Sequence, residues 1–116
     1  MDKYSIGIDF GTLSARALLI NIATGKEIAS CVYEYPHKVI ETELPGGKKL
    51  SGSWALQDPQ DYLDAMGAVL KGVLEKSKVN NNDIVGVGID FTSCTMLPVD
   101  KNNTPVSSLP QYKSEP

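Results

Sequence analysis

The sequence predicts a mixed α/β fold, in which an antiparallel meander of three strands is followed by a helix and a parallel strand. Three apolar runs, at about residues 4–10, 15–22 and 27–35, are separated by short polar turns. A helix-start signal then precedes residues 59–76, and another apolar run occupies residues 84–91. Strands joined by short turns pair antiparallel, whereas a helical crossover permits parallel pairing. The expected sheet is therefore mixed.

The strands are predicted from alternation and the turns from glycine and asparagine. Ile6, Ile8 and Phe10 alternate with other residues, which is typical of a strand buried on one side. Residues 23–26, 80–83 and 101–104 are turn-forming sequences, and residues 36–56 show no regular period. The last segment is polar and contains proline, and we expect no regular element there.

The helix is predicted from its first residues and from its apolar spacing. Asp58 can cap free N–H groups, Pro59 suits the first helical position, and Asp61 favours the positive end of the helix dipole. Apolar spacing predicts that the buried face consists of Leu63, Met66, Gly67, Leu70, Val73 and Leu74. We interpret this face as core packing.

Composition favours a single small domain and argues against a membrane-spanning or nucleic-acid-binding protein. The 116 residues carry a net charge of −3 and 41% are hydrophobic, which suits one small domain. No apolar run is long enough to cross a membrane, and dispersed basic residues argue against a nucleic-acid partner. Two distant cysteines, Cys31 and Cys94, fit reduced thiols in the cytoplasm. We expect Cys31 to be a packing residue; Cys94 follows a strand end and could line a site, with packing as the favoured interpretation. His37 is the single histidine, expected to be exposed or bonded locally.

The turn between the first two strands carries side chains suited to phosphate. Gly11 lets main-chain N–H groups approach an anion, Thr12 and Ser14 supply hydroxyl groups, and Arg16 supplies a positive charge. Asp9, at the end of its strand, can hold a magnesium ion directly or through water. The alternative interpretation is an ordinary hairpin whose polar residues face water.

Three motifs in order resemble those of the FGGY carbohydrate kinases. They are residues 8–16 (IDFGTLSAR), residues 54–62 (WALQDPQDY), and residues 86–95 (GVGIDFTSCT) followed by LPVD at 97–100. The resemblance covers nearly the whole chain. Within the family, the run Asp90–Thr95 is most similar to that of the L-ribulokinases.

This resemblance implies the actin/Hsp70-like (ribonuclease H-like) ATPase fold, with ATP and Mg²⁺ as cofactors. The implied reaction is phosphorylation of L-ribulose to L-ribulose 5-phosphate, a step of arabinose catabolism. The alternatives are another FGGY pentulose or polyol kinase such as a xylulokinase, an actin- or Hsp70-like ATPase without a small-molecule substrate, and a stand-alone binding domain.

The resemblance also implies roles for single residues. Asp9 would belong to the magnesium site, and Gly11, Thr12, Ser14 and Arg16 would bind phosphate. A structural ion pair is the alternative for Arg16. The sugar would contact Asp90, Thr92, Ser93, Thr95 and Trp54. Packing is the favoured alternative for Trp54. Hydrogen bonds to nearby N–H groups are the alternative for Asp90, and local bonding is likewise the alternative for Thr92 and Thr95.

FGGY kinases have two such domains with the active site between them, and their catalytic base lies far downstream of anything in this sequence. We therefore expect residues 1–116 to be the N-terminal part of the first domain, without the second domain and without a catalytic residue. Such a chain is expected to be inactive alone. Its partners would be a ketose and ATP, and its uncovered apolar surface would favour self-association.

Overall fold

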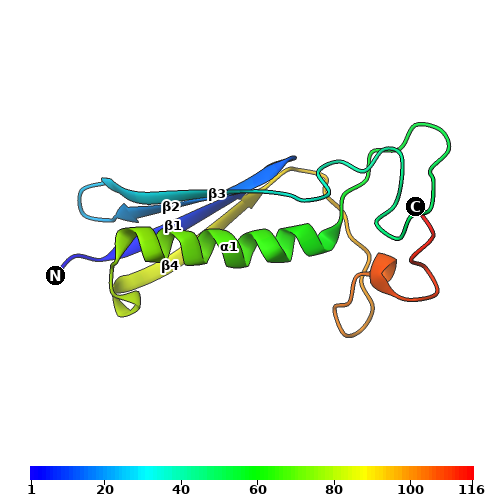
Figure 1. Ribbon diagram of the computed structural model, residues 1–116. Helices are drawn as coiled ribbons and strands as arrows, with labels where there is room; N and C mark the ends of the chain where they lie inside the picture. Colours follow the sequence, from blue (N-terminus) through cyan, green and yellow to red (C-terminus); the bar gives the residue numbers. More distant parts are fainter.

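The computed structural model describes residues 1–116 and contains a four-stranded sheet with one long helix on one face (Figure 1). The strands are β1 (Tyr4–Phe10), β2 (Ser14–Asn21), β3 (Glu27–Glu34) and β4 (Ile84–Phe91). The helices are α1 (Pro59–Ser77) and the short 3-10 helices η1 (Asn81–Asp83) and η2 (Val106–Ser108). The strand order is β3-β2-β1-β4; β1–β2 and β2–β3 are antiparallel and β1–β4 is parallel. The predicted mixed sheet is confirmed.

The core lies between α1 and the sheet. Alternate residues of β1 and β2 are buried there, namely Ile6, Ile8, Phe10, Ala15, Ala17 and Leu19. The helix begins as predicted, with the Asp58 carboxylate accepting a hydrogen bond from the Gln60 N–H and Pro59 in the first turn. It ends at Lys78, which adopts a left-handed conformation.

The prediction for the buried face of α1 was wrong at two positions. Leu63 is 62% exposed, and Gly67 is also exposed. The fully buried apolar residues are Val73, as predicted, and Ala65 and Val69, which the prediction left out; the three are spaced four residues apart. These small side chains let the helix axis approach the sheet, so that the larger Met66, Leu70 and Leu74 pack only partly buried beside them.

Gly72 marks the closest approach of α1 to β3. A Cβ atom at this position would lie 2.3 Å from Cys31 Sγ and 2.9 Å from Cys31 Cβ. The helix therefore has room for glycine alone where it crosses Cys31. The expected packing role of Cys31 is confirmed, because the residue contacts the core cluster.

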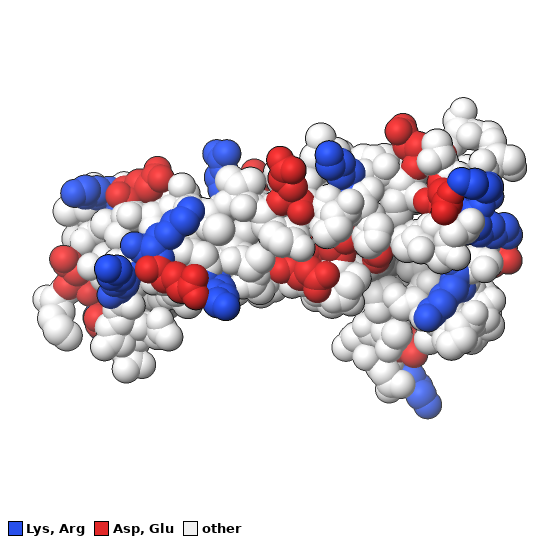
Figure 2. Space-filling model, viewed as in Figure 1, with Lys and Arg blue, Asp and Glu red and all other residues white.

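The loops extend the molecule beyond the sheet. Residues 36–58 and 92–116 gather at one end of it (Figure 1), and the overall dimensions are 55 × 28 × 24 Å. The radius of gyration is 17.1 Å, against about 13 Å for a compact chain of this length. Acidic and basic side chains are interspersed on the face seen in Figure 2. No helix combines the length and the apolar character needed to span a membrane.

Candidate functional site

The turn between β1 and β2 is closed by its own backbone. The Gly11 N–H donates to the Ser14 carbonyl oxygen at 2.8 Å, and a Cβ atom on Gly11 would lie 3.1 Å from that oxygen. Glycine is thus favoured here by space, and its φ is not in the left-handed region. Thr12 is exposed and Ser14 half-buried. Tyr35 and Gln57, to which the sequence motifs gave no role, also contact the turn.

A row of charged residues crosses three strands on the face opposite α1. Ile8 and Phe10 point toward α1, so Asp9 between them points to the other face. Asp9 is the register partner of Arg16 on β2 and of Asp90 on β4. The sheet thus places an arginine on one side of Asp9 and a second carboxylate on the other.

Arg16 is exposed and takes part in none of the ion pairs in the structure, which involve Lys3, His37, Lys49 and Lys71. The structural ion pair considered for it is therefore not found. Asp9 and Asp90 are likewise absent from the ion pairs. Two neighbouring, exposed carboxylates without a cationic partner are a donor set that suits Mg²⁺, which prefers oxygen ligands and retains several waters.

The segment after β4 continues along the end of β1. The Thr92 N–H and Oγ1–H both donate to the Phe10 carbonyl oxygen, at 3.3 and 3.4 Å, and Thr95 Oγ1–H donates to the Thr92 carbonyl at 2.8 Å. Ser93 is exposed, and Cys94 has a positive φ of 63°. These bonds hold residues 92–95 beside the phosphate-type turn.

The predicted sugar contacts lie on both sides of the sheet and do not form one group. Thr95 and Cys94 line an apolar hollow of about 590 Å³ on the α1 side of the sheet, together with Phe10, Tyr62 and Phe91. Asp9 and Asp90 lie on the other side. Cys94 is exposed, so the packing favoured for it was wrong, whereas its position in the hollow fits the alternative of a residue that lines a site.

Trp54 joins neither of these groups. It is 39% exposed, lies outside the core cluster and the hollow, and donates from Nε1–H to the Ser51 carbonyl oxygen at 3.0 Å. The packing favoured for this residue is therefore not found.

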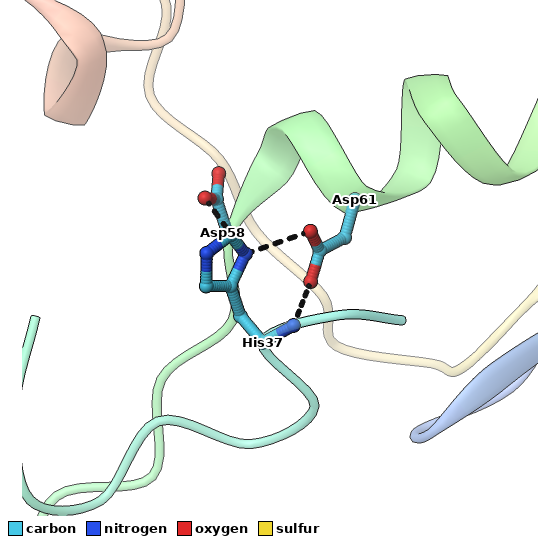
Figure 3. Close-up of side chains that lie close together, drawn as sticks. All are labelled: His37, Asp58 and Asp61. Atoms are coloured by element: carbon cyan, nitrogen blue, oxygen red, sulfur yellow. Dashed lines mark hydrogen bonds and ion pairs between the residues drawn. The ribbon is translucent and has the colours of Figure 1, made fainter. Parts of the chain in front are cut away.

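Sequence reasoning missed a cluster at the start of α1, formed by His37, Asp58 and Asp61 (Figure 3). Asp61 is 3% exposed and accepts hydrogen bonds from the His37 backbone N–H, at 3.0 Å, and from its ring Nδ1–H, at 2.8 Å. Asp58 lies 3.3 Å from the same nitrogen. The hydrogen bond to Asp61 raises the pKa of His37 above its ordinary value.

The carboxylates of this cluster are already engaged, both Asp61 oxygens by His37 and Asp58 by the Gln60 N–H. We interpret the cluster as a clamp between the loop after β3 and the first turn of α1. His37 is exposed, as the sequence predicted, and its hydrogen-bond partner Asp61 lies 24 residues away along the chain. No local pattern in the sequence joins His37 to Asp61, and the sequence interpretation of Asp61 used only the helix dipole.

Comparison with known proteins identifies the family. The sequence profile of the FGGY family of carbohydrate kinases, N-terminal domain, matches residues 4–114. Ribulokinases of Geobacillus thermodenitrificans and Halalkalibacterium halodurans are 50% and 46% identical over 115 residues, which are 98% of this chain and 20% of each relative. This chain thus spans about a fifth of the length of those relatives.

The crystal structure of gluconate kinase from Lactobacillus acidophilus matches with a TM-score of 0.71 at 24% identity, covering 91% of this chain and 19% of that chain. A xylulose kinase from the same organism matches with a TM-score of 0.70 at 24% identity, covering 90% of this chain and 18% of that chain. The expected actin/Hsp70-like fold, present here as a partial N-terminal domain, is confirmed. The chain belongs to the FGGY family of carbohydrate kinases.

Proposed function

We propose that residues 1–116 are the N-terminal part of the first domain of an ATP-dependent L-ribulokinase, which forms L-ribulose 5-phosphate in arabinose catabolism. The main support is the identity of 46–50% to proteins named ribulokinase over 98% of the chain. The second domain, the adenine site and the base that deprotonates the sugar hydroxyl would belong to further polypeptide. The two free cysteines of residues 1–116 favour a cytoplasmic enzyme.

In this proposal the turn after β1 receives the phosphoryl group. Gly11 lets the backbone approach it, and Thr12 and Ser14 offer hydroxyl groups beside the amides of the turn. Arg16 lies one strand away from Asp9, without an ion-pair partner, and supplies positive charge to the phosphate oxygens. Catalysis of this type depends chiefly on positioning and on charge stabilisation.

Asp9 and its neighbour Asp90 have different roles in this proposal, one toward the metal ion and one toward the sugar. Asp9 adjoins the turn and would hold Mg²⁺ directly or through water; the ion, when bound, neutralises charge on the phosphate oxygens. Asp90, Thr92 and Ser93 follow each other at the end of β4 and would orient the sugar hydroxyls. We retain Thr95 and Trp54 as predicted sugar contacts, although Thr95 lines the hollow on the other side of the sheet and Trp54 does not line it.

The test is ADP release by the complete gene product that carries this sequence, with a panel of L-ribulose, D-xylulose, D-gluconate and glycerol. We expect the highest kcat/KM for L-ribulose. In the same protein, Asp9→Asn should lower kcat by at least about tenfold, whereas Lys101→Gln, in a remote turn, should change nothing. Preference for D-xylulose would refute the assignment of the sugar, and sugar-dependent ADP release by residues 1–116 alone would refute the two-domain interpretation.

A further inference from the structure

The turn between β1 and β2 has three consecutive carbonyl groups, and each accepts a hydrogen bond from another part of the chain. The Gly11 oxygen accepts from the Tyr35 hydroxyl at 3.0 Å. The Thr12 oxygen accepts from Gln57 Nε2–H at 2.8 Å, and the Leu13 oxygen from the Tyr35 backbone N–H at 2.9 Å. The donors come from the end of β3 and from the segment that precedes α1.

The orientation of each carbonyl fixes the orientation of the next amide. Peptide bonds here are all trans, and in a planar trans peptide the C=O and the following N–H point in opposite directions. Drawing the Gly11 and Thr12 carbonyls toward Tyr35 and Gln57 therefore turns the N–H groups of Thr12 and Leu13 away from them. Neither N–H donates to any other protein atom.

Tyr35 and Gln57 are themselves held in place. Tyr35 is 2% exposed, and its ring packs edge-on against Tyr62 with centroids 5.3 Å apart. The Tyr62 hydroxyl donates to Gln57 Oε1, which leaves Gln57 Nε2 directed at Thr12. Phe10 also packs edge-on against Tyr62, with centroids 5.9 Å apart. Burial raises the pKa of Tyr35 to about 12, so its hydroxyl remains a hydrogen-bond donor at neutral pH.

We propose that Tyr35 and Gln57 are positioning residues that hold the turn with the amides of Thr12 and Leu13 free to bind the terminal phosphate groups of a nucleotide. This inference rests on the proposed function, because it assigns a task to the same turn. The side chains of the two residues donate to backbone carbonyl groups of the turn. Their effect passes through the backbone of Gly11 and Thr12.

The experiment uses ¹⁵N-labelled chain and three variants. Tyr35→Phe removes one hydroxyl and keeps the ring, and Gln57→Met removes the amide and keeps the length. Tyr33→Phe is the matched control, since it is the same chemical change two residues before Tyr35, on β3, at a hydroxyl with no hydrogen-bond partner. Unchanged melting temperatures would show that the variants remain folded.

Two readouts separate the inference from the proposed function. The first needs no ligand: backbone order parameters of Thr12 and Leu13 should be about 0.85 in the parent and in Tyr33→Phe, and below about 0.6 in Tyr35→Phe and Gln57→Met. The second is titration with tripolyphosphate, observed through the same two amide resonances. We expect each of the two variants to bind about fivefold more weakly, the effect of one ordinary hydrogen bond.

A turn that stays equally rigid in Tyr35→Phe and Gln57→Met would overturn the positioning role and leave the phosphate site standing. A rigid parent turn whose amides do not respond to tripolyphosphate would overturn the phosphate site, and with it the purpose proposed for the two residues. Loss of order in the variants together with weaker binding would support both.

Discussion

The two halves of the sheet carry the same apolar alternation but differ in burial. On β2, Ala15, Ala17 and Leu19 are 0% exposed, beneath α1. On β4, Val87, Ile89 and Phe91 are 51%, 52% and 63% exposed, although their register partners on β1 are buried. The difference is the helix, which packs against β2 and β3. Alternation in a sequence thus predicts which face of a strand is apolar, but not what covers that face.

The largest expected effect on the free energy of unfolding comes from truncating one large side chain to alanine, compared between the covered and the uncovered half of the sheet. Leu19→Ala should lower the free energy of unfolding by about 2–5 kcal/mol, because it leaves a cavity under α1. Ile89→Ala, on the uncovered half, should change it by about 0.5 kcal/mol. Urea unfolding of both variants checks the difference. Equal losses would mean that β4 is covered in solution.

Two glycines of α1 test how closely the helix approaches the covered half. Gly72→Ala should destabilise the chain by about 1–3 kcal/mol, because its Cβ would collide with Cys31. Gly67→Ala is the matched control, since nothing lies within 4 Å of its Cβ position. That substitution should stabilise the chain by about 0.5–1 kcal/mol through a less flexible unfolded state. Thermal unfolding should therefore show shifts of opposite sign, and two upward shifts would contradict the close contact.

The uncovered half should pair with a second copy of the chain. β4 is an edge strand with unpaired backbone groups on its outer side. Antiparallel pairing with Gly88 opposite itself would place Val87 opposite Ile89, and Asp90 opposite Gly86, so that no like charges meet. We predict a dimer at micromolar concentration by sedimentation equilibrium.

The control for this dimer is a variant with two lysines in place of exposed apolar residues of β4. Val87→Lys combined with Ile89→Lys should weaken association at least about tenfold, because four like charges would then face each other in the dimer. The same change should leave the circular dichroism of the monomer unchanged. A parent chain that stays monomeric at high concentration would rule out this pairing.

Sequence reasoning located the elements well where local chemistry determines them. The Asp58-Pro59 start of α1 and the bounds of β1 and β4 follow from capping and alternation, and the structure has them there. Sequence reasoning failed where the burial of a residue depends on which other element packs against its helix or strand. The burial of Ala65 in preference to Leu63 is decided by the distance between helix and sheet, which no local pattern contains.

In the candidate site, too, features set by local sequence could be predicted and contacts between distant segments could not. The turn at Gly11 and the neighbouring carboxylates of Asp9 and Asp90 could be anticipated, because both aspartates end strands. The contacts of Gln57 and His37 could not, since their partners are 45 and 24 residues away. Such contacts depend on how the loop of residues 36–58 folds back onto the turn and the helix.

The smallest expected effect concerns the clamp that ties this loop to the covered half. The pKa of His37 is raised in the folded chain, chiefly by its hydrogen bond to Asp61. Protonated His37 therefore stabilises the fold fully below its unfolded pKa of about 6.5. That stability is lost as the pH rises through the higher folded value. We expect the parent to unfold at a slightly lower urea concentration at pH 8 than at pH 6.

His37→Gln isolates this effect, because glutamine cannot titrate. Its urea midpoint should change less between pH 6 and pH 8 than that of the parent, and the difference should be modest because the His37 side chain is 41% exposed. Lys49→Gln, which removes an exposed partner of Glu43 in the same loop, should keep the pH dependence of the parent. If His37→Gln kept that dependence as well, the clamp would contribute nothing to stability through charge.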